Sequence, residues 1–177
     1  MGVSAAFLTG DIFNLYVWFE VMLVSSFVLI SLGNTKRQLE GSVKYVVLSL
    51  LSSGFLLTGV AMLYKTAGTL NMADLAVKAA AAPAGDQGLI AASALVLTVV
   101  FALKAAVVPL HFWLPGAYSA TTGAVAALFA IMTKVGAYAI IRTGTLIFGE
   151  DAGAAAFVAG PWLLPAAIAT TFIGFIG

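Results

Sequence analysis

Long apolar runs constrain the fold of this chain more than any other feature of its sequence. Four of them cover residues 12–32, 43–64, 89–114 and 123–148, and a fifth covers 157–177. Each of the four reaches or approaches the roughly 20 apolar residues that cross a bilayer core about 30 Å thick. The chain is 62% hydrophobic and 8% charged, whereas soluble domains are about 45–50% apolar and about 25% charged. The sequence therefore predicts an integral membrane protein.

The runs predict helices, because they are continuously apolar instead of alternating over about ten residues as barrel strands do. We expect an all-α bundle of about five transmembrane helices within a single transmembrane domain over 1–177, the fifth helix being truncated. Residues 1–11 are interpreted as the tail of an earlier helix, not as a cleaved signal peptide. With an apolar segment cut at each end, the sequence is typical of an internal piece of a larger protein.

Charges in the loops predict how the bundle is oriented. The loop 33–42 carries Lys36 and Arg37, whereas the loop 149–153 is acidic. Cytoplasmic loops are enriched in lysine and arginine, so the loop 33–42 is expected in the cytoplasm and the acidic loop outside. The Ala-rich stretch 77–85 is expected to be an outer loop or a short surface helix.

Three ionisable residues lie deep inside the apolar runs, namely Glu20, Lys104 and Lys134. At about 1.5 Å per helical residue, each lies roughly 12 to 16 Å from the nearer end of its run. A charge near the bilayer midplane costs at least about 2.5–3.5 kcal/mol, and such residues usually face a bundle interior or a hydrated cavity. The three residues therefore predict a lateral row of charges at mid-membrane.

The economical arrangement pairs Glu20 with one of the two lysines, because opposite charges attract strongly in a low-dielectric interior. The remaining lysine could then take up and release a proton. A buried pair that only fixes helix packing remains the alternative. Arg142 is interpreted as an interfacial anchor, because its long stem can reach the outer surface from the end of its helix.

The third run contains a helix breaker, Pro109, five residues after Lys104. Proline removes a backbone hydrogen bond and clashes with the preceding turn, so a kink or break is expected near 105–109. Broken helices line ion paths in many transporters. The single histidine, His111, follows the break, either as a proton relay or as an interfacial residue beside Trp113.

Several function classes find no support in the sequence. A net charge of +1 does not indicate a nucleic-acid partner. The chain has no cysteine, which excludes disulfides, thiol catalysis and cysteine-ligated metal. There is no P-loop, dinucleotide fingerprint or paired histidine at ligand spacing. No catalytic residue, metal or cofactor is therefore expected.

Three stretches carry a resemblance to a known family. They are "TGDIFNLYVWFEVMLVSSFVLISLG" (9–33), "ALKAAVVPLHFWLPGAY" (102–118) and "AVAALFAIMTKVGAYAIIR" (124–142). Together they resemble the proton-conducting membrane subunits shared by Mrp-type multisubunit cation/proton antiporters and respiratory complex I. The FEVML-SSF pattern around Glu20 most resembles the D-type subunits of the Mrp antiporters.

The resemblance implies two inverted five-helix repeats, each with a broken helix, and a mid-membrane row of charges that moves protons. It implies that Glu20 is the family's essential glutamate, Lys104 its partner on the broken helix, and Lys134 the connecting lysine on the next helix. His111 matches the histidine after the break. The chain would supply most of the first repeat and the start of the second. The loop "SATTGAV" (119–125) departs from the family by lacking prolines.

The resulting hypothesis is a multi-pass subunit of a monovalent cation/proton antiporter, with Na⁺ as the expected cation, in a bacterial plasma membrane. Its expected partners are other membrane subunits of that complex, the lipid bilayer, protons and monovalent cations. It would be a transporter subunit and not an enzyme. One alternative is a proton-pumping subunit of complex I or of a membrane-bound hydrogenase. Another is a structural assembly subunit whose buried charges only specify packing.

Overall fold

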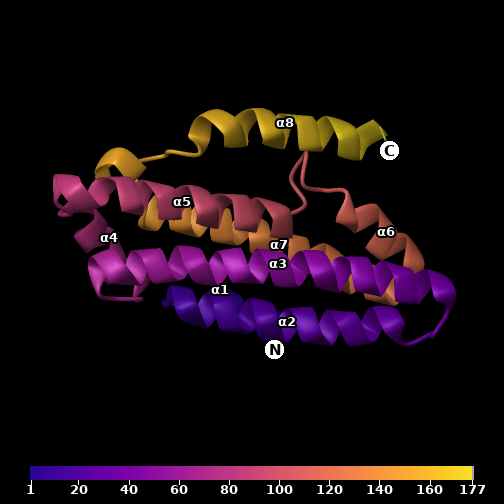
Figure 1. Ribbon diagram of the computed structural model, residues 1–177. Coiled ribbons are helices and arrows are strands. Elements are labelled where there is room, and N and C mark those ends of the chain that lie inside the picture. Colours follow the sequence, from indigo (N-terminus) through magenta and orange to yellow (C-terminus); the bar gives the residue numbers. More distant parts are fainter. Residues whose placement is uncertain (177) are drawn as a thin grey trace.

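The computed structural model describes residues 1–176 as a helical bundle (Figure 1). Within these residues, five helices are long and apolar enough to cross a membrane, which confirms the predicted all-α membrane fold. The elements are α1 Gly2–Leu8, α2 Ile12–Ser31, α3 Lys36–Ala67, α4 Met72–Ala80, α5 Ala84–Lys104, α6 Trp113–Ala120, α7 Gly123–Leu146, the short 3₁₀ helix η1 Gly153–Ala155, and α8 Gly160–Ile176.

The ends of the observed helices are set by polar capping residues and not by the ends of the apolar runs. The Asp11 side chain accepts a hydrogen bond from the Asn14 N–H and starts α2. Thr35 and Gln38 form a capping box that starts α3 seven residues before the predicted run, satisfying backbone donors that the helix itself leaves free. Gly68 ends α3 in the left-handed conformation, with φ of 66°. Polar caps thus extend the helices beyond their apolar cores.

The predicted third run, 89–114, forms two helices instead of one. The helix α5 ends at Lys104, α6 starts at Trp113, and residues 105–112 connect them without regular structure. The break predicted near Pro109 is therefore confirmed. The predicted fifth run begins as a loop and continues as α8, and its last residue, Gly177, lies outside the described residues.

The helix α3 packs against α2 and α5, and α7, which lies behind α3 and α5 in Figure 1, packs against α5. The core between these helices is apolar, with Leu56, Leu97, Phe101 and Val135 almost completely buried. The helix α8 lies along the outside of the bundle in Figure 1, and none of its described residues is buried. The charged residues of the apolar runs therefore lie on helices that pack side by side.

The end of the bundle that is predicted to face outward is joined by polar contacts. The Ile12 N–H donates to the Leu70 carbonyl at 3.0 Å. Arg142 Nη1 donates to the Phe7 carbonyl in the last turn of α1 at 3.2 Å, and its side chain is half-buried beside Tyr138. Arg142, which the sequence predicts as a membrane anchor, thus also satisfies a carbonyl at a helix end.

Candidate functional site

The break after Lys104 forms the centre of the candidate site. The chain turns out of α5 at Ala106, which has a left-handed φ of 57°, a conformation that costs energy for a residue with a Cβ. The indole N–H of Trp113 donates to the Leu103 carbonyl at 2.9 Å. The Val108 N–H, free in the break, donates to Thr170 Oγ1 of α8 at 2.8 Å. These contacts hold the broken segment in place directly beside Lys104.

Gly136 allows α7 to approach this break closely. A Cβ built on Gly136 would lie 2.6 Å from the backbone nitrogen of Ala105 and 2.8 Å from the carbonyl carbon of Lys104. Only a residue without a side chain fits this position. The glycine of the Thr-Lys-x-Gly motif is therefore required by packing, and it places Lys134, two residues earlier, at about the depth of Lys104.

Glu20 is half-buried on the face of α2 that meets α3. The Ser53 hydroxyl of α3 donates a short hydrogen bond to Glu20 Oε1. A hydrogen bond to an ionised carboxylate is stronger than one between neutral groups. Ser53 thus orients the carboxylate and offsets part of the cost of placing it in the bundle.

Lys104 lies near Glu20 without forming a direct ion pair with it. Its Nζ lies 5.8 Å from the centre of the Phe19 ring, one residue before Glu20. The salt bridge found within residues 1–176 is the surface pair Lys78–Asp74, at 3.0 Å. The direct Glu20–lysine contact favoured by the sequence is therefore replaced by a serine on the carboxylate and an aromatic ring under the ammonium.

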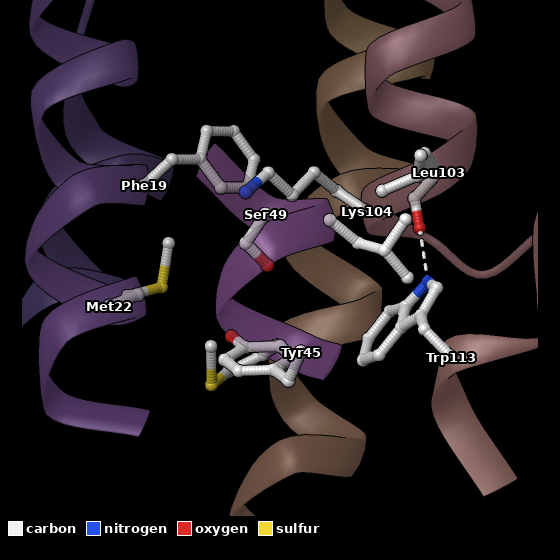
Figure 2. Close-up of a pocket in the computed structure, with 9 residues that line it drawn as sticks. Phe19, Met22, Tyr45, Ser49, Leu103, Lys104 and Trp113 are labelled. Carbon is white, nitrogen blue, oxygen red and sulfur yellow. Dashed lines mark hydrogen bonds between the residues drawn. The ribbon is translucent and has the colours of Figure 1, made fainter. Parts of the chain in front are cut away.

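A cavity of about 30 Å³ lies beside Lys104 (Figure 2). Figure 2 shows the Ser49 hydroxyl and the Lys104 side chain at this cavity, with the Tyr45 ring below them. A space of this size with several polar groups can hold a water molecule. The lining residues are Phe19, Met22, Tyr45, Leu48, Ser49, Leu103, Lys104, Trp113 and Met132.

The structure does not bring Lys134 and His111 into contact with Glu20. The Lys134 side chain points away from the packed face of α7 and is exposed among the described residues, whereas its neighbours Thr133 and Val135 are buried. His111 lies in the break, and its buried Nδ1 has no hydrogen-bond partner within residues 1–176. Glu20, Lys104 and the break at Pro109 thus lie together, whereas Lys134 and His111 lie apart from Glu20.

The polar face of α3 was not predicted from the sequence. Ser42, Tyr45, Ser49 and Ser53 follow one another at intervals of three or four residues, and all are buried. A helix aligns such positions on one face. That spacing within an apolar run was the available signal, although serines in membrane helices often bond only to their own backbone.

Known proteins share much of the sequence of this bundle. Residues 9–177 match the family described as "NADH:quinone oxidoreductase/Mrp antiporter, TM". The chain belongs to this family. It is 53% identical over 151 residues to the D-type subunit of the Na(+)/H(+) antiporter of Bacillus subtilis, covering 85% of the chain and 30% of that relative. It is 44% identical over 176 residues to the D-type subunit of a probable K(+)/H(+) antiporter of Rhizobium meliloti, covering 99% of the chain and 33% of that relative.

Two solved structures have folds similar to this chain. The Mrp complex from Dietzia sp. DQ12-45-1b matches with a TM-score of 0.73 and 38% identity, over 83% of the chain and 28% of the matched chain. A membrane-bound sulfane sulfur reductase, an archaeal respiratory membrane complex, matches with a TM-score of 0.81 and 33% identity. The match covers 93% of this chain and 33% of the matched chain. The chain spans about a third of the length of the curated relatives it matches.

Proposed function

We propose that this chain forms part of a proton-translocating membrane subunit in a multisubunit monovalent cation/proton antiporter. The observation that carries the proposal is the joint position of Glu20 and Lys104 at a helix break beside a cavity that can hold water. Ionisable groups at this depth are costly and usually serve ion or proton pathways. The antiporter subunits of Bacillus subtilis and Rhizobium meliloti support the same assignment.

The two residues are coupled by charge. An ionised Glu20 favours the charged form of Lys104, because attraction over a few ångströms is strong in a low-dielectric interior. When Glu20 takes up a proton, this support is lost and Lys104 can release its own. Phe19 and Ser53 keep the groups close without a direct pair, which leaves both free to exchange protons with water.

The proposed path continues toward Lys134, which lies on the neighbouring helix at about the same depth. An exposed ammonium at this depth is costly against lipid tails. We therefore propose that protein or water in the full assembly covers this face of α7. His111, whose buried Nδ1 is without a partner within residues 1–176, is proposed to act as a relay on the inner side of the break.

A second candidate function uses the same site in a different membrane complex. The match to the archaeal respiratory complex favours a proton-pumping subunit driven by electron transfer. In that case the chain would hold no redox group and would receive its driving force from other subunits. The genes beside this one distinguish the two assignments, because small antiporter subunits and quinone-oxidoreductase subunits are not both expected there.

Transport in everted membrane vesicles that carry the full complex tests the proposed function. Glu20→Ala and Lys104→Ala are each expected to reduce cation-dependent proton exchange about tenfold or more. Each substitution removes one charged group and leaves the other without its counterpart. Ser25→Ala is a matched control, since Ser25 is exposed on the same helix as Glu20 and bonds to its own backbone. Undiminished exchange in both site variants would overturn the proposal.

A further inference from the structure

The buried polar groups of α3 form a line that leads away from Glu20. We call Ser42, Tyr45, Ser49 and Ser53 the hydroxyl stripe. The stripe begins at Ser53, which donates to Glu20, and it ends near the predicted inner end of α3. Its members are between 1% and 7% exposed. A helix rises about 1.5 Å per residue, so the stripe covers about 16 Å of membrane depth.

Two hydroxyls of this stripe differ from ordinary helix serines. Ser42, and Ser52 beside Ser53, donate to carbonyls in their own helix, which is the usual way to satisfy a hydroxyl in an apolar environment. Ser53 instead donates across to Glu20, and Ser49 lines the cavity that contains Lys104. These two side chains therefore connect the stripe to both charged residues of the site.

Tyr45 continues the stripe below the cavity. It lines the same cavity as Ser49 (Figure 2), and its ring packs against Trp113 and Phe129, with ring centres 5.6 Å and 6.2 Å apart. These aromatic rings close the inner side of the cavity with apolar surface. The Tyr45 hydroxyl is therefore a polar group among the aromatic rings on this side of the cavity.

Within residues 1–176, no hydrogen bond joins successive members of the stripe. Four residues correspond to about 6 Å along the helix, whereas two hydroxyls bond at about 2.8 Å. One bridging water spans such a gap and is nearly as good as a direct bond. The cavity of about 30 Å³ between Ser49, Tyr45 and Lys104 has room for a bridging water.

We propose that the hydroxyl stripe is a water-assisted proton branch between the Glu20–Lys104 site and the inner end of α3, with Tyr45 as its relay residue. In the relay step, the Tyr45 O–H bond breaks as its proton passes to a water on one side. A new O–H bond forms with a proton from the water on the Ser49 side. Tyrosine is unchanged and one proton has moved. This inference rests on the proposed transport function.

Tyr45→Phe tests the relay, because it removes the hydroxyl and keeps the ring contacts. In everted vesicles with the full complex, we expect the maximal exchange rate to fall about a hundredfold, the lower end of the range for a positioned proton-transfer group. The cation concentration for half-maximal rate should remain unchanged. Tyr64→Phe is the matched control on the same helix, since Tyr64 is 55% exposed, and it should retain the wild-type rate.

A second pair of variants separates the hydroxyl from packing at Ser49. Ser49→Ala should slow exchange, and Ser49→Thr, which restores a hydroxyl, should recover most of the rate. Glu20→Gln serves as the reference for the proposed function. If Glu20→Gln abolishes exchange while Tyr45→Phe exchanges at the wild-type rate, the relay is wrong and the transport function stands. If Glu20→Gln itself exchanges normally, both are wrong. A changed half-maximal cation concentration in Tyr45→Phe would assign Tyr45 to packing and overturn the relay.

Discussion

The two sides of the break after Lys104 are built differently. On the side of α2 and α3, Glu20 accepts a hydrogen bond from Ser53, and Phe19, only 4% exposed, lies beside the Lys104 ammonium. On the side of α7, the backbone packs tightly at Gly136 while the Lys134 side chain is exposed. The residues of this chain thus surround one part of the charged row and leave the other part open.

The two parts of the predicted row therefore depend on different contacts. The Glu20–Lys104 part depends on contacts within the described bundle, so substitutions there should act on both stability and transport. The Lys134 part depends on what covers α7 in the full assembly, because an exposed ammonium at this depth is costly against lipid. The largest effects of substitution are therefore expected where the bundle is packed around the break.

Gly136→Ala should have the largest effect. Its Cβ would lie 2.6 Å from a backbone atom of Ala105, and backbone cannot move aside as a flexible side chain can. We expect a loss of about 2–3 kcal/mol from overpacking and displacement of Lys104. The lowered melting temperature of the complex in detergent would measure it.

Two other glycine substitutions provide controls for the loss of stability. Gly144→Ala on the same helix should be silent, because no atom lies within 4 Å of the position that its Cβ would take. Gly59→Ala should be intermediate, since its Cβ would meet Leu97 Cδ2 at 2.9 Å, the end of a flexible side chain. Equal melting temperatures for Gly136→Ala and Gly144→Ala would contradict the close approach of α7 to the break.

Ser53→Ala should have the next largest effect. It removes the donor to Glu20, and hydrogen bonds to charged groups contribute about 1.5–3 kcal/mol. We expect slower proton exchange in everted vesicles and a modest loss of stability. Ser52→Ala is the neighbouring control, because Ser52 donates to its own helix. If the two variants behave alike, the Ser53 contact has no role in positioning Glu20.

Thr170→Val should have a smaller effect. It removes the acceptor of the Val108 N–H in the break, and an unpaired amide costs about 1–3 kcal/mol where water cannot reach it. Thr171→Val is the matched control, because Thr171 is exposed and bonds to its own helix. Hydrogen exchange at the Val108 amide should rise in Thr170→Val alone. Equal protection in both variants would show that α8 does not hold the break.

Asp74→Asn should have the smallest effect, because its pair with Lys78 lies on the surface. The hydrogen bond from Lys78 holds the pKa of Asp74 below its usual value. A carboxylate with a lowered folded-state pKa adds stability above its unfolded-state pKa and loses it as the pH falls through the lowered value. An exposed pair contributes little even then. The melting temperature at pH 7 should match wild type within error, and a large decrease would contradict the surface position.

The fold was largely predictable from the sequence, because long apolar runs have few alternatives in a membrane. Pro109 indicated the break, since a residue without an N–H cannot continue a helix. The depths of Glu20 and Lys104 followed from counting residues along their runs. Helix limits were less accurate, because caps such as Thr35 extend a helix into polar sequence.

The contacts of the site were not predictable in the same way. The partner of Glu20 depends on which face of α3 meets α2, and an apolar run does not reveal its buried face. Ser53 and Phe19 therefore took the place of the expected direct ion pair. The exposure of Lys134 and the contact of Arg142 with the Phe7 carbonyl likewise follow from tertiary packing.

The most direct test of the central claim is proton exchange by the double variant Glu20→Gln/Lys104→Met in the full complex. This variant removes both charges together, so neither is left buried without its counterpart, and assembly should be retained. If the two residues carry protons, the assembled complex should exchange at the level of vesicles without it. Wild-type exchange by the assembled double variant would show that the pair only specifies packing, and would contradict the account.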